Sequence, residues 1–426
     1  MKHSRRELAP GVWLTAIQTP KFKSGYWSVQ FLAPMGEEAA ANALVPKVLR
    51  RGTVRHPGLN QLTAALDDLY GGAVEAMVRK KGEAQCVGFA AAFLDDALAP
   101  GGEDLLRSAA DLLGELLLSP ALEGGAFRAG WLEGERTNLI DQIRGEVNDK
   151  RMYAQQRAIE LMYEGTGYGL DAKGTVEAAE RVTAEGLYHR WQDLLHAAPM
   201  ELYYCGSAAP DRVAEVWTAA LERLPAGERR PVSQGGVKPV SGEVRRFTDQ
   251  LDVTQGKLVL GFRSGGVNIE HLAYPAFLVL NAVYGGTATS KLFLNVREKR
   301  SLCYYASSGV DKLKGLMLVS SGVEFDRFQA AEDEILAQLE CCRRGEITEE
   351  ELAAAKRSLV SGLRSTLDAQ GQLEEFWLTQ NAGGAGEGPE ELAGRIEQVS
   401  VSDVTEQAQR TELDVIYRME GPHGTT

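Results

Sequence analysis

The spacing of apolar residues predicts strands followed by helices in the first half of the chain. Within 25–33, Trp27, Val29 and Phe31 alternate with polar or small residues, and a period of two is typical of a half-buried strand. In chain order, the expected elements are strands at 11–17 and 25–33, helices at 38–51 and 59–69, strands at 73–79 and 84–93, and helices at 102–117 and 123–163. Strands followed by helices indicate an α+β layer rather than alternating βαβ units.

The second half shows a similar order of elements. It contains a strand at 257–263, helices at 272–284 and 289–296, strands at 304–310 and 316–323, and helices at 328–343 and 348–368. Residues 225–243 are rich in Pro, Gly and charge without periodicity, which is typical of a linker. We therefore predict an α+β protein with two similar domains, 1–224 and 244–426. Each is expected to be an antiparallel-rich sheet with helices packed on one face, and the linker 225–243 joins them into a clamshell.

Composition and charge narrow the class of protein. The 426 residues, 44% apolar and 25% charged, are enough for two globular domains. No segment approaches the ~20 consecutive apolar residues of a membrane span, and no apolar segment follows the basic start, so we expect a cytoplasmic protein with no membrane partner. The net charge of −13 argues against nucleic acid, which binds basic surfaces. Five cysteines without a C-x-x-C pair indicate reduced thiols.

The stretch 285–305 is the strongest candidate for a binding site. A glycine turn leads into a helix that places Arg297 at its end, and Tyr304 follows in the next strand. Guanidinium and phenol are oriented donors, so the two side chains could hold a peptide carbonyl or carboxylate. Considered alone, the pair also fits a surface ion pair and a half-buried ring.

The sequence of this stretch indicates a family. The run G-G-x-x-x-S-K-L-F-x-x-V-R-E-K-R-S-L-C-Y, from Gly285 to Tyr304, resembles the carboxyl-half signature of the pitrilysin or insulinase-like metallopeptidases, which include the mitochondrial processing peptidase. The resemblance implies that Arg297 and Tyr304 hold the substrate backbone near a zinc ion bound by the other half of a clamshell.

The same resemblance predicts where the metal motif should lie. Active members carry H-x-x-E-H on the first helix of the amino half, followed by Gly-Thr. Counting back from Gly52-Thr53, the two His positions fall on Ala43 and Lys47, and the catalytic Glu position falls on Pro46. The third ligand is the second Glu of an E-x6-E pair, and here that position is Gln142. None of these four residues replaces the one it displaces, so we expect no zinc and no other cofactor.

The histidines offer no alternative metal site. They are His3, His56, His189, His196, His271 and His423. His189 and His196 share a helix face, but their seven-residue spacing places them about 10 Å apart along the helix axis. We interpret His189 and His196 as part of a solvated helix face. An active peptidase that uses unusual metal ligands is the least favoured hypothesis.

Within this family, an intact motif at Arg297 and Tyr304 combined with a metal site that lacks its ligands resembles the non-catalytic subunit of a two-subunit zinc peptidase. A homologous partner would carry H-x-x-E-H, and this chain would supply Arg297 and Tyr304 to a peptide substrate. The opening Lys21-Phe22-Lys23 looks most like the bacterial zinc-less homologues associated with elongation factor P modification. The alternative is a peptide-binding or scaffold homologue with no proteolytic role, and a homodimer is possible when the partner is missing.

Overall fold

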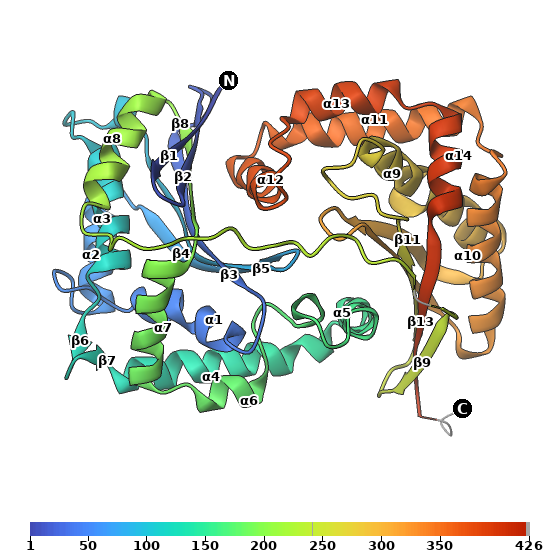
Figure 1. The fold of residues 1–426 in the computed structure, drawn as a ribbon, viewed down its shortest axis with the longest axis horizontal. Coiled ribbons are helices and arrows are strands. Elements are labelled where there is room, and N and C mark those ends of the chain that lie inside the picture. Colours follow the sequence, from blue (N-terminus) through green and yellow to red (C-terminus); the bar gives the residue numbers. More distant parts are fainter. Residues whose placement is uncertain (241, 423–426) are drawn as a thin grey trace. The chain divides into compact units, whose positions relative to one another are not determined.

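The chain forms two compact units. The computed structural model describes residues 1–240 and 242–422, and Figure 1 shows the elements in sequence colours. The first unit consists of Met1–Arg144 and Leu170–Ser233, and the second of Gly145–Gly169 and the chain from Gln234 onward. Among the described helices, none is long and apolar enough to cross a membrane.

The first unit contains a six-stranded sheet in the order β1-β2-β8-β3-β5-β4. Its strands are β1 (Lys2–Ala9), β2 (Val12–Gln18), β3 (Ser24–Pro34), β4 (Ala73–Lys81), β5 (Ala84–Leu94) and β8 (Met200–Gly206). Only β2 and β8 are parallel, and every other neighbouring pair is antiparallel. The prediction of an antiparallel-rich sheet is therefore confirmed for this unit.

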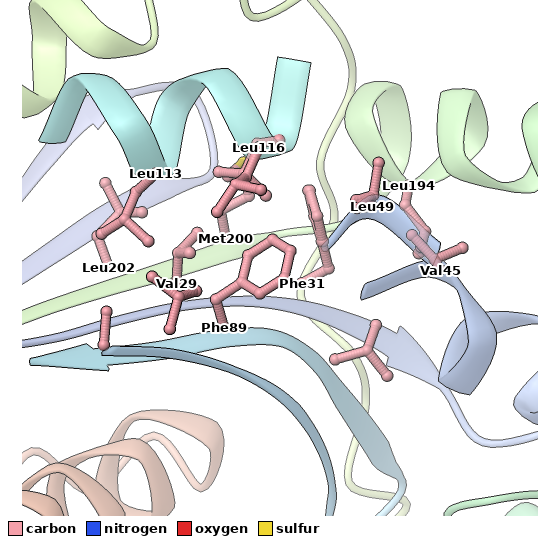
Figure 2. Close-up of a cluster of buried hydrophobic side chains, with 14 of the residues drawn as sticks. Val29, Phe31, Val45, Leu49, Phe89, Leu113, Leu116, Leu194, Met200 and Leu202 are labelled. Carbon is pink, nitrogen blue, oxygen red and sulfur yellow. The ribbon is translucent and has the colours of Figure 1, made fainter. Parts of the chain in front are cut away.

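Helices pack on the apolar face of this sheet. They are α1 (Ala39–Leu49), α2 (Leu59–Asp68), α3 (Leu105–Leu118), α4 (Ala129–Gly145), α6 (Val176–Arg181), α7 (Ala184–Ala197) and α8 (Pro210–Ala220), with a small hairpin of β6 (Leu122–Glu123) and β7 (Ala126–Phe127). Val29 and Phe31 of β3 and Phe89 of β5 lie in one buried cluster with Leu113 and Leu116 of α3 (Figure 2). Alternate residues of a strand point to one face, so the period-two pattern of 25–33 produces this core.

The second unit contains a five-stranded sheet in the order β11-β12-β10-β13-β9. Its strands are β9 (Arg245–Gln250), β10 (Gly256–Arg263), β11 (Cys303–Asp311), β12 (Leu316–Val323) and β13 (Glu412–Glu420). Its α-helices are α5 (Lys150–Met162), α9 (Tyr274–Asn281), α10 (Phe328–Arg343), α11 (Glu349–Thr366), α12 (Gln370–Ala382), α13 (Pro389–Gln398) and α14 (Val401–Arg410). Two π-helical segments, Ala282–Gly286 and Leu292–Lys299, follow α9.

The two sheets share one strand order once β1 is set aside. In the amino sheet β2 lies parallel to β8, and in the carboxyl sheet β9 lies parallel to β13. In both sheets, the earliest of the five shared strands thus pairs with the latest. The last strand pairs with β3 or β10, and the third strands, β4 and β11, each form an edge. This shared topology supports the repeat that the sequence pattern predicted, and the α+β fold class is confirmed.

Helix α5 covers the second face of the carboxyl sheet. Ala154 and Ala158 of α5 are fully buried against Val259 of β10 and Tyr417 of β13. Arg263 of β10 donates to Met162 O at 2.8 Å, which stabilises the carboxyl end of α5. The segment Gly145–Gly169 therefore groups with the carboxyl unit, although the predicted range 1–224 assigned it to the amino half.

Two predicted helices differ from those observed. The helix expected at 123–163 is broken, because Asp149 caps a new helix by accepting from the amides of Arg151 and Met152. The break lies close to the point where the chain passes from one unit to the other. The helix expected at 289–296 is observed as the π-helical segment Leu292–Lys299.

The predicted linker contains one boundary between the units. Ser233 and Gln234 fall inside 225–243, and the residues from 225 to 240 form neither helix nor strand. Ser241 of this range lies outside the described residues. The clamshell arrangement of the two domains stays a prediction.

Candidate functional site

The segment from α9 to β11 builds the candidate peptide-binding site in the carboxyl unit. We call Leu292–Lys299 the Arg297 helix; its widened turn is shown by the amide of Arg300, which donates to Asn295 O at 3.1 Å. π-helical turns occur frequently at functional sites. Gly285 precedes this helix where space is short, since a Cβ there would lie 2.8 Å from the backbone nitrogen of Ser308.

Ser301 ends the Arg297 helix in a left-handed conformation, with φ 51°. The amide of Ser301 donates to Arg297 O at 3.1 Å, and the amide of Leu302 donates to Val296 O at 3.0 Å. Arg327 also donates to Ser301 O at 2.9 Å. These bonds resemble a glycine-type helix stop and direct the chain from Arg297 into β11.

Replacing Ser301 with glycine is expected to stabilise the protein. Glycine adopts φ > 0 without the steric cost of a Cβ, so Ser301→Gly should raise the free energy of unfolding by about 0.5–1 kcal/mol. The matched control is Ser361→Gly within α11, where glycine should lower that free energy by a similar amount. Urea unfolding of both variants measures the difference, and a destabilised Ser301→Gly would contradict the proposed strain.

Arg297 projects from the end of its helix with few competing contacts. Its side chain is 41% exposed and lies 3.6 Å from the carboxylate of Glu298, which is itself exposed. The guanidinium also stacks 4.7 Å from the centre of the Phe293 ring. A long, exposed ion pair is worth little, so Arg297 can exchange it for a ligand carbonyl or carboxylate.

Tyr304 is the extra residue of a β-bulge. Cys303 pairs with Val323 and Tyr305 with Gly322, so Tyr304 has no partner residue on β12. Bulges re-aim side chains and are frequent beside active sites. Tyr304 is 59% exposed, and its hydroxyl donates to the carboxylate of Glu324. That hydrogen bond, reinforced by the charge of Glu324, raises the pKa of Tyr304 and keeps the phenol protonated as a donor.

Arg297 and Tyr304 are close along the chain but do not bond to each other. Burial raises the pKa of Cys303, the neighbour of Tyr304. The charge of Arg297 acts in the opposite direction but is outweighed. Cys303 is therefore a poor nucleophile. Glu324 could not be identified from the sequence as the partner of Tyr304, since twenty residues separate them and no local pattern links them.

Two polar contacts fix the Arg297 helix against the helices behind it. Lys291, 9% exposed at its side chain, forms an ion pair of 2.8 Å with Glu351 at the start of α11. Asn295 donates to Gln338 of α10 at 2.7 Å, and Gln338 in turn donates to Glu334 at 2.7 Å. These contacts position the helix without using the Arg297 side chain.

The Lys291–Glu351 ion pair is expected to make stability depend on pH. Burial alone would raise the pKa of Glu351, but the hydrogen bonds from Lys291 and Thr348 outweigh it and lower that pKa. The stabilisation is then present above the ordinary pKa of a glutamate and is lost as pH falls through the lowered value. Allowing for solvent screening, the free energy of unfolding of wild type should exceed that of Glu351→Gln by about 1 kcal/mol at neutral pH. The difference should be smaller in acid.

Urea unfolding across that pH range measures this difference. Glu349→Gln, a change of the same kind at an exposed position of the same helix, is the matched control and should show a smaller pH dependence. A Glu351→Gln curve parallel to wild type at all pH values would contradict the assignment.

The structure brings two of the predicted metal-site positions together in the amino unit. Lys47 on α1 donates to Gln142 of α4, with a distance of 3.2 Å from Nζ to Oε1. Ala43, one turn earlier on α1, is fully buried. Pro46 lies inside α1, where it removes one backbone hydrogen bond. The structure thus brings positions 47 and 142 together, as the resemblance implies, while a common site of all four positions stays a prediction.

These residues do not fit a zinc ion. Ala43 and Pro46 have no donor atom for a metal, and the Lys47 ammonium is a cation. Burial lowers the pKa of Lys47, while the charge of Glu135 raises it. Glu135 is itself paired with Arg51 at 2.5 Å. The hydrogen bond from Lys47 on α1 and the ion pair of Arg51, just after α1, thus link this part of the chain to α4 at the positions where the resemblance places the metal site.

The remaining candidates do not form a second site. His189 and His196 lie exposed on α7, and no group of three His, Cys, Asp or Glu residues in the described ranges could hold a metal. His423 lies outside the described residues. All five cysteines are free thiols, and burial raises the pKa of Cys342 on α10 to about 12.

Comparison with known proteins places these features in a family context. A family model described as the Peptidase M16 inactive domain matches residues 181–359. The chain is 33% identical over 420 residues to a Bacillus subtilis protein, probable inactive metalloprotease YmfF, covering 98% of this chain and 97% of that protein.

Solved structures show the same fold. A conserved protein from Enterococcus faecalis V583 superposes with a TM-score of 0.91 at 27% identity, covering 100% of both chains. A Pseudomonas fluorescens structure described as a peptidase M16 inactive domain superposes with a TM-score of 0.78 at 16% identity, also over 100% of both chains.

Proposed function

Because this chain belongs to the M16 peptidase family, as a homologue of the inactive type, we propose that it is the non-catalytic subunit of a heterodimeric zinc metallopeptidase. The partner is a homologous subunit that carries H-x-x-E-H. This chain supplies Arg297 and Tyr304, which hold the backbone of a peptide substrate. The association with elongation factor P modification and the cytoplasmic location stay predictions.

The exposure of the two donors supports this proposal most directly. Arg297 and Tyr304 each have one carboxylate neighbour, Glu298 and Glu324, and both side chains face solvent. The scaffold alternative would gain if both side chains were buried in ion pairs within their own domain, and neither is buried. Guanidinium and phenol groups bonding a carbonyl that gains negative charge stabilise it most where water is excluded.

The degenerate metal site supports the non-catalytic part of the proposal. Lys47 donates to Gln142 at positions where active relatives bind zinc. Ala43, Pro46, Lys47 and Gln142 offer neither a carboxylate nor an imidazole to bind a metal and activate water. Activity would therefore require a second subunit.

Association with a partner is the experiment that tests this function. The purified chain is mixed with an M16 homologue that carries H-x-x-E-H, and sedimentation measures the mass of the complex. We expect a one-to-one heterodimer of higher affinity than any homodimer of this chain. If the chain binds extended peptides but no such homologue, the alternative of a peptide-binding or scaffold protein is correct instead.

A further inference from the structure

A pocket of about 420 Å³ opens at one end of the amino-unit sheet, away from the residues discussed above. It lies where β3 begins and where β5 and β8 end, and the starts of α3 and α8 complete its wall. A volume of this size suits a small molecule or one long side chain. Nothing in the proposed function uses this pocket.

Aromatic rings line the pocket, and one of them carries an unused donor. The Trp27 and Tyr204 rings pack edge to face with centroids 4.9 Å apart, and both side chains are at least 98% buried. No described residue accepts a hydrogen bond from Trp27 Nε1. Unlike Nε1 of the neighbouring Trp217, which is fully buried without a partner, Trp27 Nε1 keeps some exposed surface, so its N–H can still reach an acceptor.

The position of Gly25 shows that this donor faces the pocket. Gly25 and Trp27 both line the cavity. A Cβ on Gly25 would lie 3.3 Å from Trp27 Nε1 and 3.1 Å from the Tyr204 ring. The absence of a side chain at Gly25 therefore leaves Nε1 reachable from the cavity, where a ligand carbonyl could accept from it.

The pocket also contains carboxylates without a cation. Asp95 and Asp96 line it, and neither forms an ion pair in the described part of the chain. Arg212, also in the wall, is already committed to Glu215 at 2.6 Å and to Asp104. Burial raises the pKa of Asp96, the amide of Leu106 lowers it, and the charges of Asp104 and Asp95 raise it further. The site therefore has excess negative charge beside an aromatic wall.

The geometry points to a binding site for a lysine side chain of a peptide, with its ammonium at Asp96 and its backbone carbonyl at Trp27 Nε1. A cation is attracted both by a carboxylate and by the faces of aromatic rings. The methylene chain of lysine covers the apolar wall formed by Phe93, Leu105 and Leu106. This inference is independent of the proposed function.

Binding of Nα-acetyl-L-lysine amide to the full chain tests this inference. With the tryptophans labelled with nitrogen-15, we expect a saturable shift of one indole N–H resonance, which is missing from Trp27→Phe. Nα-acetyl-L-norleucine amide, which lacks the ammonium, should bind at least about tenfold more weakly. Butylamine, which lacks the carbonyl, should also bind more weakly and leave the Trp27 resonance in place.

Two Asp→Asn variants test whether the charge of Asp96 contributes to binding. Asp96→Asn should weaken binding of the lysine derivative at least about tenfold, and Asp111→Asn, an exposed position of α3 outside the pocket, should not change it. Equal affinity for the lysine and norleucine amides, or an unmoved Trp27 resonance at saturation, would overturn the inference. The comparison of the two amides uses wild-type protein, so it does not depend on the folding of any variant.

Discussion

Replacing Arg297 with alanine is expected to lower kcat/KM of the heterodimer for a peptide substrate by about 10²-fold. The Arg297 side chain is 41% exposed, and its contacts are a 3.6 Å ion pair with Glu298 and stacking on Phe293, so the change should leave the thermal midpoint nearly unaltered. Arg297→Lys should recover part of the activity, because lysine keeps the charge but not the two-pronged geometry. Tyr304→Phe, which removes one neutral donor, should cost about tenfold.

A matched variant distinguishes a substrate contact from a general charge effect. Lys299→Ala removes one positive charge from an exposed position of the same helix and should leave kcat/KM unchanged. The rates are measured with one fluorogenic peptide at several salt concentrations, since a pure long-range effect is screened by salt. Equal losses for Lys299→Ala and Arg297→Ala would contradict the role assigned to Arg297.

Restoring the three ligand positions together with the catalytic Glu position is expected to create a zinc site. The variant A43H, P46E, K47H, Q142E should bind one zinc ion per chain, at least about 10³-fold more tightly than wild type. Residues 43 and 47 lie one turn apart on α1, and the 3.2 Å contact between Lys47 and Gln142 shows that the third ligand position is within reach. Removing Pro46 also relieves a helix defect that typically costs about 3 kcal/mol.

Metal content after dialysis measures this change. The triple variant A43H, P46E, K47H, in which Gln142 is retained, is the matched control and should bind zinc more weakly because an amide replaces a carboxylate. Circular dichroism reports whether each variant is folded. A folded quadruple variant that holds no zinc would show that α1 and α4 have moved away from the geometry that a metal requires.

The sequence predicted the elements whose periodicity was strong and missed those defined by distant contacts. Alternation in 25–33 predicted β3, and helical spacing in 328–343 matched α10. The strands β8, β9 and β13 are short apolar or mixed runs, and their place is set by pairing with strands far along the chain. The break at Asp149 depended on a cap that competed with a continuous helical pattern.

The candidate site was predicted to a different extent in its two parts. Counting back from Gly52-Thr53 assigned Lys47 to a metal-ligand position of the family motif. The structure places Lys47 against Gln142, ninety-five residues away. In the carboxyl half, the motif identified Arg297 and Tyr304 but gave no sign of the bulge at Tyr304 or of Glu324. Both depend on the register of β11 against β12, which no local pattern specifies.

The rate of peptide hydrolysis by the mixed subunits tests the central claim most directly. Each chain is assayed alone and then together at equal concentration, with zinc content measured in every sample. We expect hydrolysis well above the sum of the separate rates, with all zinc on the partner, and loss of that gain with Arg297→Ala. Zinc-dependent hydrolysis by this chain alone, or a mixture no faster than its separate components, would contradict the account.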